Sequence, residues 1–114
     1  MNQRQQILSK SNGRCWYCGI ELQKGWHVDH FQPVRRYNGE MTAPENDVPE
    51  NLVPSCPSCN IMKSDRTIEG FRSLLANLVK SLNRDISIYR HAKRYGLVEE
   101  SEKEVKFWFE ELEK

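Results

Sequence analysis

The stretch Trp26-His27-Val28-Asp29-His30-Phe31-Gln32-Pro33 decides the fold, because a cysteine pair stands on either side of it. Cys15-x-x-Cys18 precedes the stretch, and Cys56-x-x-Cys59 follows it, with 37 residues between the two pairs. Two such pairs predict a tetrahedral four-cysteine zinc site built from two knuckles. The long separation is compatible with this site, because a loop lengthens at small entropic cost. A redox or disulfide pair and buried inert thiols are the alternatives.

Size and composition favour one small domain. The chain has 114 residues, of which 38% are hydrophobic and 29% charged, so a metal is a natural supplement to its core. No apolar run approaches the roughly 18 residues of a membrane span, and residues 1–6 lack the apolar centre of a signal peptide. We therefore expect a soluble cytoplasmic protein without a membrane partner, in a compartment where structural disulfides are rare.

Charge is unevenly distributed along a chain whose formal net charge is only +1. Residues 67–98 carry 6 basic and 2 acidic side chains, whereas residues 99–114 carry 3 and 7. The basic segment could meet phosphate, and the acidic segment would not. We hypothesise that residues 99–114 pack over or near the basic helices and limit non-specific binding of DNA.

Local patterns predict short elements around the cysteines. We expect a helix over residues 2–10, a strand over 26–31 ended by Pro33, and a second short strand near 34–37 that completes a hairpin with it. Residues 38–54 have the composition of a loop, with three prolines and a glycine. A helix is expected from about Cys56 to Lys63 or Asp65.

The remainder of the chain is predicted to be helical. Apolar residues recur at helical spacing over residues 67–82. Asp85 can cap a second helix that runs to about Tyr95, and a third is expected from about Ser101. The apolar stripes of these helices are interpreted as core or as a dimer face.

Asp29 and His30 are the candidates for chemistry. A carboxylate suits Mg²⁺ or Mn²⁺, and an adjacent neutral imidazole can take a proton near pH 7. Asn51 and Asn60 add amide groups near the second cysteine pair, one able to ligate a hard cation and one able to orient an imidazole. These residues alone indicate a metal-assisted hydrolase.

Taken together, these motifs resemble the HNH endonucleases. The resemblance rests on Cys-x-x-Cys, Val28-Asp29-His30-Phe31-Gln32-Pro33, Asn51-Leu52-Val53 and Cys56-x-x-Cys59-Asn60-x-x-Lys63, in that order. It implies an α+β fold: a ββα-metal (His-Me finger) motif, stapled by a four-cysteine zinc site, with additional α-helices in the C-terminal half. Residues 1–114 would form a single HNH nuclease domain, with a core over 13–66 and a helical extension over 67–114.

The resemblance also implies roles. His30 would be the general base that activates water, Asp29 and Asn60 would hold one catalytic Mg²⁺ or Mn²⁺ (other divalent ions are also used), and Asn51 would hold the His30 loop by a hydrogen bond. Lys63 would contact phosphate, its alternative being a solvated surface charge.

Three further residues are candidates for substrate binding. His27 could be a phosphate contact or a partner of a site residue, and its alternative is a surface or packed histidine. Arg35 and Arg36 could bind phosphate. Alternatively, their side chains form only a solvated edge.

The expected function is hydrolysis of DNA phosphodiester bonds by a phage or bacterial protein. A zinc-stapled nucleic-acid-binding module without catalysis is the first alternative, and an adaptor that uses the C-terminal helices is the second. We expect nicking or weak sequence preference, unless the chain forms a homodimer.

Overall fold

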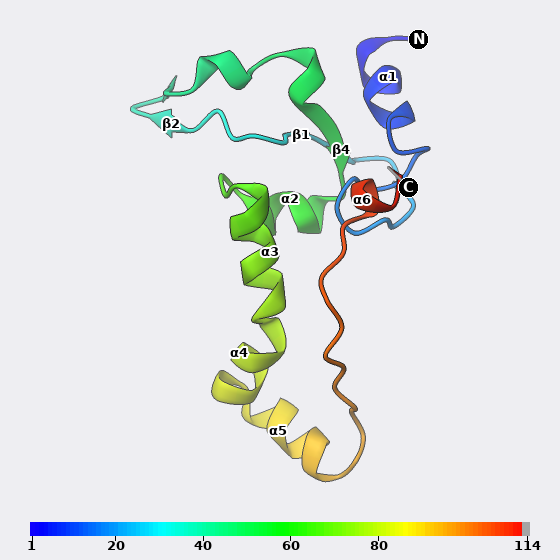
Figure 1. Ribbon diagram of the computed structural model, residues 1–114, viewed down its shortest axis with the longest axis vertical. Helices are drawn as coiled ribbons and strands as arrows, with labels where there is room; N and C mark the ends of the chain where they lie inside the picture. Colours follow the sequence, from blue (N-terminus) through cyan, green and yellow to red (C-terminus); the bar gives the residue numbers. More distant parts are fainter. Residues whose placement is uncertain (113–114) are drawn as a thin grey trace.

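The computed structural model describes residues 1–112, which form a mixed α and β structure with extents of 50 × 35 × 27 Å (Figure 1). Among these residues the helices are α1 Gln3–Ser9, α2 Pro57–Lys63, α3 Ile68–Ala76, α4 Leu78–Asp85, α5 Ser87–Arg94 and α6 Trp108–Leu112. The strands are β1 His27–His30, β2 Arg36–Tyr37, β3 Glu40–Met41 and β4 Leu52–Ser55, with 3-10 turns at Pro44–Asn46 and Pro49–Asn51. None of the helices in this part of the chain could cross a membrane.

The central sheet pairs β1 with β4 in antiparallel register, so that Asp29 lies opposite Val53 and His30 opposite Leu52. The expected hairpin between 26–31 and 34–37 is therefore wrong. β1 ends at His30, shortly before Pro33, and the chain makes a long excursion to β4 instead of turning directly back. The sheet thus brings the Asp29-His30 pair next to the segment that leads into the second cysteine pair.

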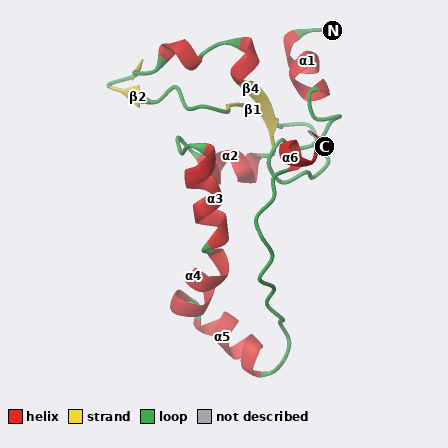
Figure 2. Ribbon diagram, in the orientation of Figure 1, coloured by secondary structure: helices red, strands yellow, loops and turns green. Residues whose placement is uncertain are grey.

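A second, separate hairpin lies within this excursion (Figure 2). Arg36 pairs with Met41 and Tyr37 with Glu40, and Asn38-Gly39 forms the connecting turn with φ of 51° and 82°. Asn-Gly is the favoured sequence for such a turn, because both central residues need positive φ. The loop predicted over 38–54 therefore contains β3, two 3-10 turns and the first three residues of β4.

Helices α3, α4 and α5 form an arm that leads away from the sheet, and the segment after α5 returns to α6, which lies near the sheet (Figures 1 and 2). Two helices, α3 and α4, replace the single helix predicted over 67–82, because the helical backbone is interrupted at Asn77. Asp85 ends α4 instead of capping α5, whose N-cap is Ile86. The third helix begins at Trp108 rather than Ser101, and residues 101–107 have no regular secondary structure.

The core joins both halves of the chain. Cys15, Tyr17 and Val53 are buried together with Phe71 from α3 and Phe107 from the returning segment. Ring stacking continues this cluster, because the ring of Phe107 lies 5.6 Å from that of Phe109 and 5.5 Å from that of Phe71. Aromatic packing in the core thus supports the site that is described below.

Candidate active site and zinc centre

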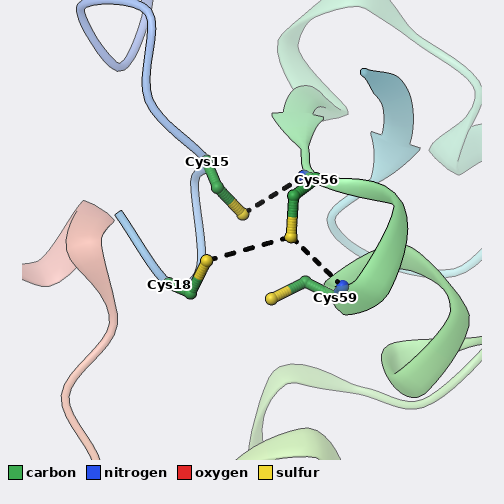
Figure 3. Close-up of side chains that lie close together, drawn as sticks. All are labelled: Cys15, Cys18, Cys56 and Cys59. Atoms are coloured by element: carbon green, nitrogen blue, oxygen red, sulfur yellow. Dashed lines mark hydrogen bonds between the residues drawn. The ribbon is translucent and has the colours of Figure 1, made fainter. Parts of the chain in front are cut away.

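The four cysteine sulfurs lie within 4.8 Å of one another (Figure 3). Sγ of Cys18 is 3.8 Å from Sγ of Cys56, which is the edge expected of a tetrahedron whose Zn–S bonds are about 2.3 Å long. Two of the sulfurs also accept hydrogen bonds from backbone N–H groups: that of Cys56 donates to Sγ of Cys15 and that of Cys59 donates to Sγ of Cys56, each at 3.3 Å. The donor set fits zinc, as predicted.

Ionisation differs among the four thiols. A hydrogen bond with the Cys59 thiol and bonds from backbone N–H groups lower the pKa of Cys15 to about 4, although burial opposes them. The same contact raises the pKa of Cys59, and burial raises the pKa of Cys18 to about 11. Cys15 therefore ionises before Cys18 and Cys59, and a cation is needed to hold those two thiols deprotonated beside it.

Asp29 is buried in β1 and faces α2. Its Oδ2 accepts a hydrogen bond from the Tyr17 hydroxyl at 2.5 Å and forms an ion pair with Nζ of Lys63 at 3.1 Å. Its Oδ1 accepts no hydrogen bond from residues 1–112. Burial, followed by the charge of Asp29, raises the pKa of Tyr17, so the phenol stays a donor to the carboxylate.

His30 forms a contact that the sequence did not predict. Its Nε2 lies 2.8 Å from Oδ1 of Asp47, in the loop between the two 3-10 turns. Because a carboxylate accepts, Nε2 carries the proton, and Nδ1 of the neutral ring keeps its lone pair. That nitrogen is the one available to take a proton from water.

Asn51 ties the chain after His30 to the start of β4. Its side-chain Oδ1 accepts from the Gln32 N–H, its Nδ2 donates to the Gln32 carbonyl, and both distances are 2.8 Å. Nδ2 also donates to the carbonyl of Asn46 at 2.7 Å. This is the kind of contact that the family resemblance implies for Asn51.

Asn60 is joined to His27 and not to Asp29 by hydrogen bonding. Its Nδ2 lies 3.2 Å from Nδ1 of His27, so the imidazole accepts and its own proton resides on Nε2. Oδ1 of Asn60 has no hydrogen-bond partner within the described residues. One of these two oxygens comes from a carboxylate and the other from an amide, and both types suit Mg²⁺ or Mn²⁺ as ligands.

A cavity of about 350 Å³ opens beside the Asp29-His30 pair. Arg35 and Arg36 line it, as do Ser64 and Asp65 from the end of α2. The cavity is thus lined by two acidic residues, one histidine and two arginines. His27 and Asn60 do not line it.

Lys63 takes neither of the positions considered for it from the sequence. Its side chain is fully buried, and its ammonium donates to the carbonyl of His30 at 3.0 Å in addition to pairing with Asp29. A buried and paired ammonium does not reach a phosphate in the cavity, and it is not a solvated surface charge. Lys63 instead supports the two residues of the pair.

Sequence reasoning did not single out Tyr17 or Asp47. No spacing signal identifies either, because each reaches its partner across a long separation in sequence. Tyr17 and Asp29 are 12 residues apart, and His30 and Asp47 are 17 apart.

Comparison with known proteins identifies the same segment. Residues 15–66 match the HNH endonuclease family. The four clustered cysteines fit the zinc-binding subgroup of HNH domains. Over 56 residues the chain is 39% identical to protein ea31 of Escherichia phage lambda, an alignment that covers 48% of this chain and 17% of that relative. No solved structure gives a significant match.

Proposed function

We propose that this chain is a metal-dependent HNH endonuclease that hydrolyses DNA phosphodiester bonds. The observation that carries the proposal is the cavity in which Asp29 and His30 meet Arg35 and Arg36. A phosphodiester needs a base to activate water, positive charge around its oxygens and a cation near the leaving group. The side chains at this cavity supply the first two.

His30 is the proposed general base. Asp47 accepts the Nε2–H and holds the ring, so Nδ1 takes a proton from water. Arg35 and Arg36 bind the phosphate through their guanidinium groups, which match its oxygens in geometry and charge. Asn51 keeps the chain after His30 in place through Gln32.

Asp29 and Asn60 are the proposed ligands of Mg²⁺ or Mn²⁺. In such a site the ion supplies positive charge that stabilises the phosphate and the departing 3′ oxygen. The match to the HNH family supports DNA as the substrate, and the phage relative supports a phage or bacterial origin. A single chain is proposed to nick in the bacterial cytoplasm, and a homodimer would be needed for double-strand cleavage.

The test is cleavage of supercoiled plasmid with Mg²⁺ or Mn²⁺. We expect the zinc-loaded protein to give nicked product that is lost in EDTA and in His30→Ala. His91→Ala is the matched control, since it removes an exposed imidazole on α5, outside the cavity. Equal activity of the parent and His30→Ala would refute the assignment of the base.

One observation favours a zinc-stapled nucleic-acid-binding module without catalysis. The buried ammonium of Lys63 already neutralises Asp29, which is the charge that a divalent ion would otherwise provide. Under this second proposal the protein binds DNA in a zinc-dependent way and does not cleave it with any hard divalent ion. The same plasmid assay, together with a binding titration, separates the two functions.

A further inference from the structure

Both partners of the Asp29 carboxylate contact the same oxygen, Oδ2. The Tyr17 hydroxyl and the Lys63 ammonium contact Oδ2, and both side chains are buried, with exposures of 1% and 0%. A buried ammonium and a buried phenol are costly to maintain unless they are paired. Their convergence on Oδ2 fixes the rotation of the carboxylate, and Oδ1 accepts no hydrogen bond from residues 1–112. Asp29 is also one of the residues that line the cavity.

Each of these partners is placed by one of the two cysteine pairs. Tyr17 lies between Cys15 and Cys18 in the first knuckle. Lys63 is one helical turn after Cys59 on α2, a helix whose N-cap is Cys56. Binding of one zinc ion by all four thiolates therefore sets the distance between Tyr17 and Lys63, and with it the position of Oδ2.

Lys63 also fixes the neighbouring residue. Its ammonium donates to the backbone carbonyl of His30 at 3.0 Å, so one side chain holds both Asp29 and the peptide unit of His30. Two of the three N–H donors of the ammonium are thus directed at consecutive residues of β1.

We propose that Tyr17 and Lys63 are positioning residues that couple the four-cysteine zinc site to Asp29, by turning Oδ2 into the protein and presenting Oδ1 to a divalent cation. This inference rests on the proposed function for the identity of the cation, but its central readout is binding of that cation and does not require cleavage. Tyr17 keeps its hydroxyl on Oδ2 while the cation is bound at Oδ1.

The first test is Tyr17→Phe, which removes the donor and keeps the ring in the aromatic core. Free Mn²⁺ is measured by electron paramagnetic resonance with zinc-loaded protein, and Tyr95→Phe, an exposed tyrosine on the arm, is the matched control. We expect the affinity for Mn²⁺ to fall about tenfold in Tyr17→Phe, as for other residues that orient a metal ligand, with zinc content unchanged. In the plasmid assay kcat should fall while KM for DNA stays the same.

Two outcomes would overturn the inference. One is an unchanged or higher Mn²⁺ affinity in Tyr17→Phe, and the other is a parent protein whose Mn²⁺ binding does not depend on Asp29, as judged with Asp29→Asn. Mn²⁺ binding that depends on Asp29 and Tyr17 in a protein that never cleaves DNA would refute the proposed function and support this inference. Equal cleavage by Tyr17→Phe and the parent would support the proposed function and refute this inference.

A second measurement covers the case in which Tyr17→Phe does not retain zinc. In the zinc-loaded parent, the Tyr17 hydroxyl proton should be visible by nuclear magnetic resonance, slow to exchange with water, and still present when Mg²⁺ saturates the site. Loss of this resonance on addition of Mg²⁺ would mean that the phenol leaves Oδ2, and the inference would be wrong.

Discussion

The side-chain amide of Asn51 pairs with the backbone of Gln32 in both directions, as a neighbouring strand would. It accepts from the Gln32 N–H and donates to the Gln32 carbonyl, each at 2.8 Å, and the backbone carbonyl of Asn51 accepts from the Phe31 N–H at 2.9 Å. The ladder between β1 and β4 is thus extended past His30 by one side chain. The position of the proposed base depends on this extension.

Asn51→Asp should therefore impair cleavage without loss of zinc. The substitution is isosteric, but it turns a carboxylate toward the carbonyls of Gln32 and Asn46, which repel it. We expect activity to fall by about 10- to 100-fold, the usual effect of displacing an orienting residue. Asn38→Asp, in the exposed turn between β2 and β3, is the matched control, and a comparable loss there would argue against this account.

Asp47 is expected to increase the cleavage rate by orienting His30 and not by its charge alone. Asp47→Asn weakens the hydrogen bond that fixes the imidazole, so single-turnover cleavage should slow by about tenfold. Asp65→Asn removes an equal charge from the rim of the same cavity, where no hydrogen bond to His30 exists. If both variants slow the reaction equally, charge at the cavity and not orientation of His30 explains the effect.

Gly19 is predicted to be the glycine least tolerant of substitution. Its φ is +79°, and a Cβ there would lie 3.1 Å from Cε3 of Trp108. Gly13 has a φ of +82°, but a Cβ there meets nothing within 4 Å. Both alanine variants should lose roughly 1–2 kcal/mol from backbone strain, and Gly19→Ala should lose more because α6 is pushed from the first knuckle. Thermal unfolding of the zinc-loaded variants measures the difference, and equal losses would contradict the prediction.

The acidic segment contacts the basic arm at Glu100, whereas Trp108 and Phe109 of the same segment contact the first knuckle. The carboxylate of Glu100 accepts from Asn83, Lys93 and Tyr89, and these contacts lower the pKa of Glu100 to about 2. Lys93 pairs with it at 3.0 Å. Glu100→Gln should therefore free one positive charge for DNA, tightening non-specific binding and steepening the dependence of log K on log salt by about one unit.

The control for this titration is Glu102→Gln, which removes an equal charge from a residue that forms no ion pair within residues 1–112. Global charge effects would move both variants alike. An unchanged salt slope in Glu100→Gln would show that Lys93 does not contact DNA phosphate.

The sequence predicted those parts of the site that are local in the chain. The cysteine spacing, the strand that carries Asp29, and α2 with Asn60 each follow from a few neighbouring residues. The partner of β1 did not, because Pro33 indicates only where β1 ends and not which segment pairs with it. The break at Asn77 was also missed, since the apolar periodicity passes through it.

The long-range polar contacts were the part of the site that was hardest to predict from the sequence. A lysine on a short helix near a nuclease motif suggests a phosphate contact, yet Lys63 is buried against Asp29. Its ammonium lies 5.8 Å from the centre of the Tyr17 ring, which itself packs against Phe71 and Phe107 from two distant segments. Only packing in three dimensions determines whether such a charge faces solvent or a carboxylate.

The return of the chain from the arm to the first knuckle has a consequence for synthesis on the ribosome. The backbone N–H groups of Trp108 and Phe109 donate to the carbonyls of Tyr17 and Trp16, and Phe107 fills the core behind them. A nascent chain that stops before Phe107 already contains every proposed site residue and all four cysteines, but the knuckle that places Tyr17 is unsupported. Maturation of the site is therefore expected to wait until the ribosome has released these last aromatic residues.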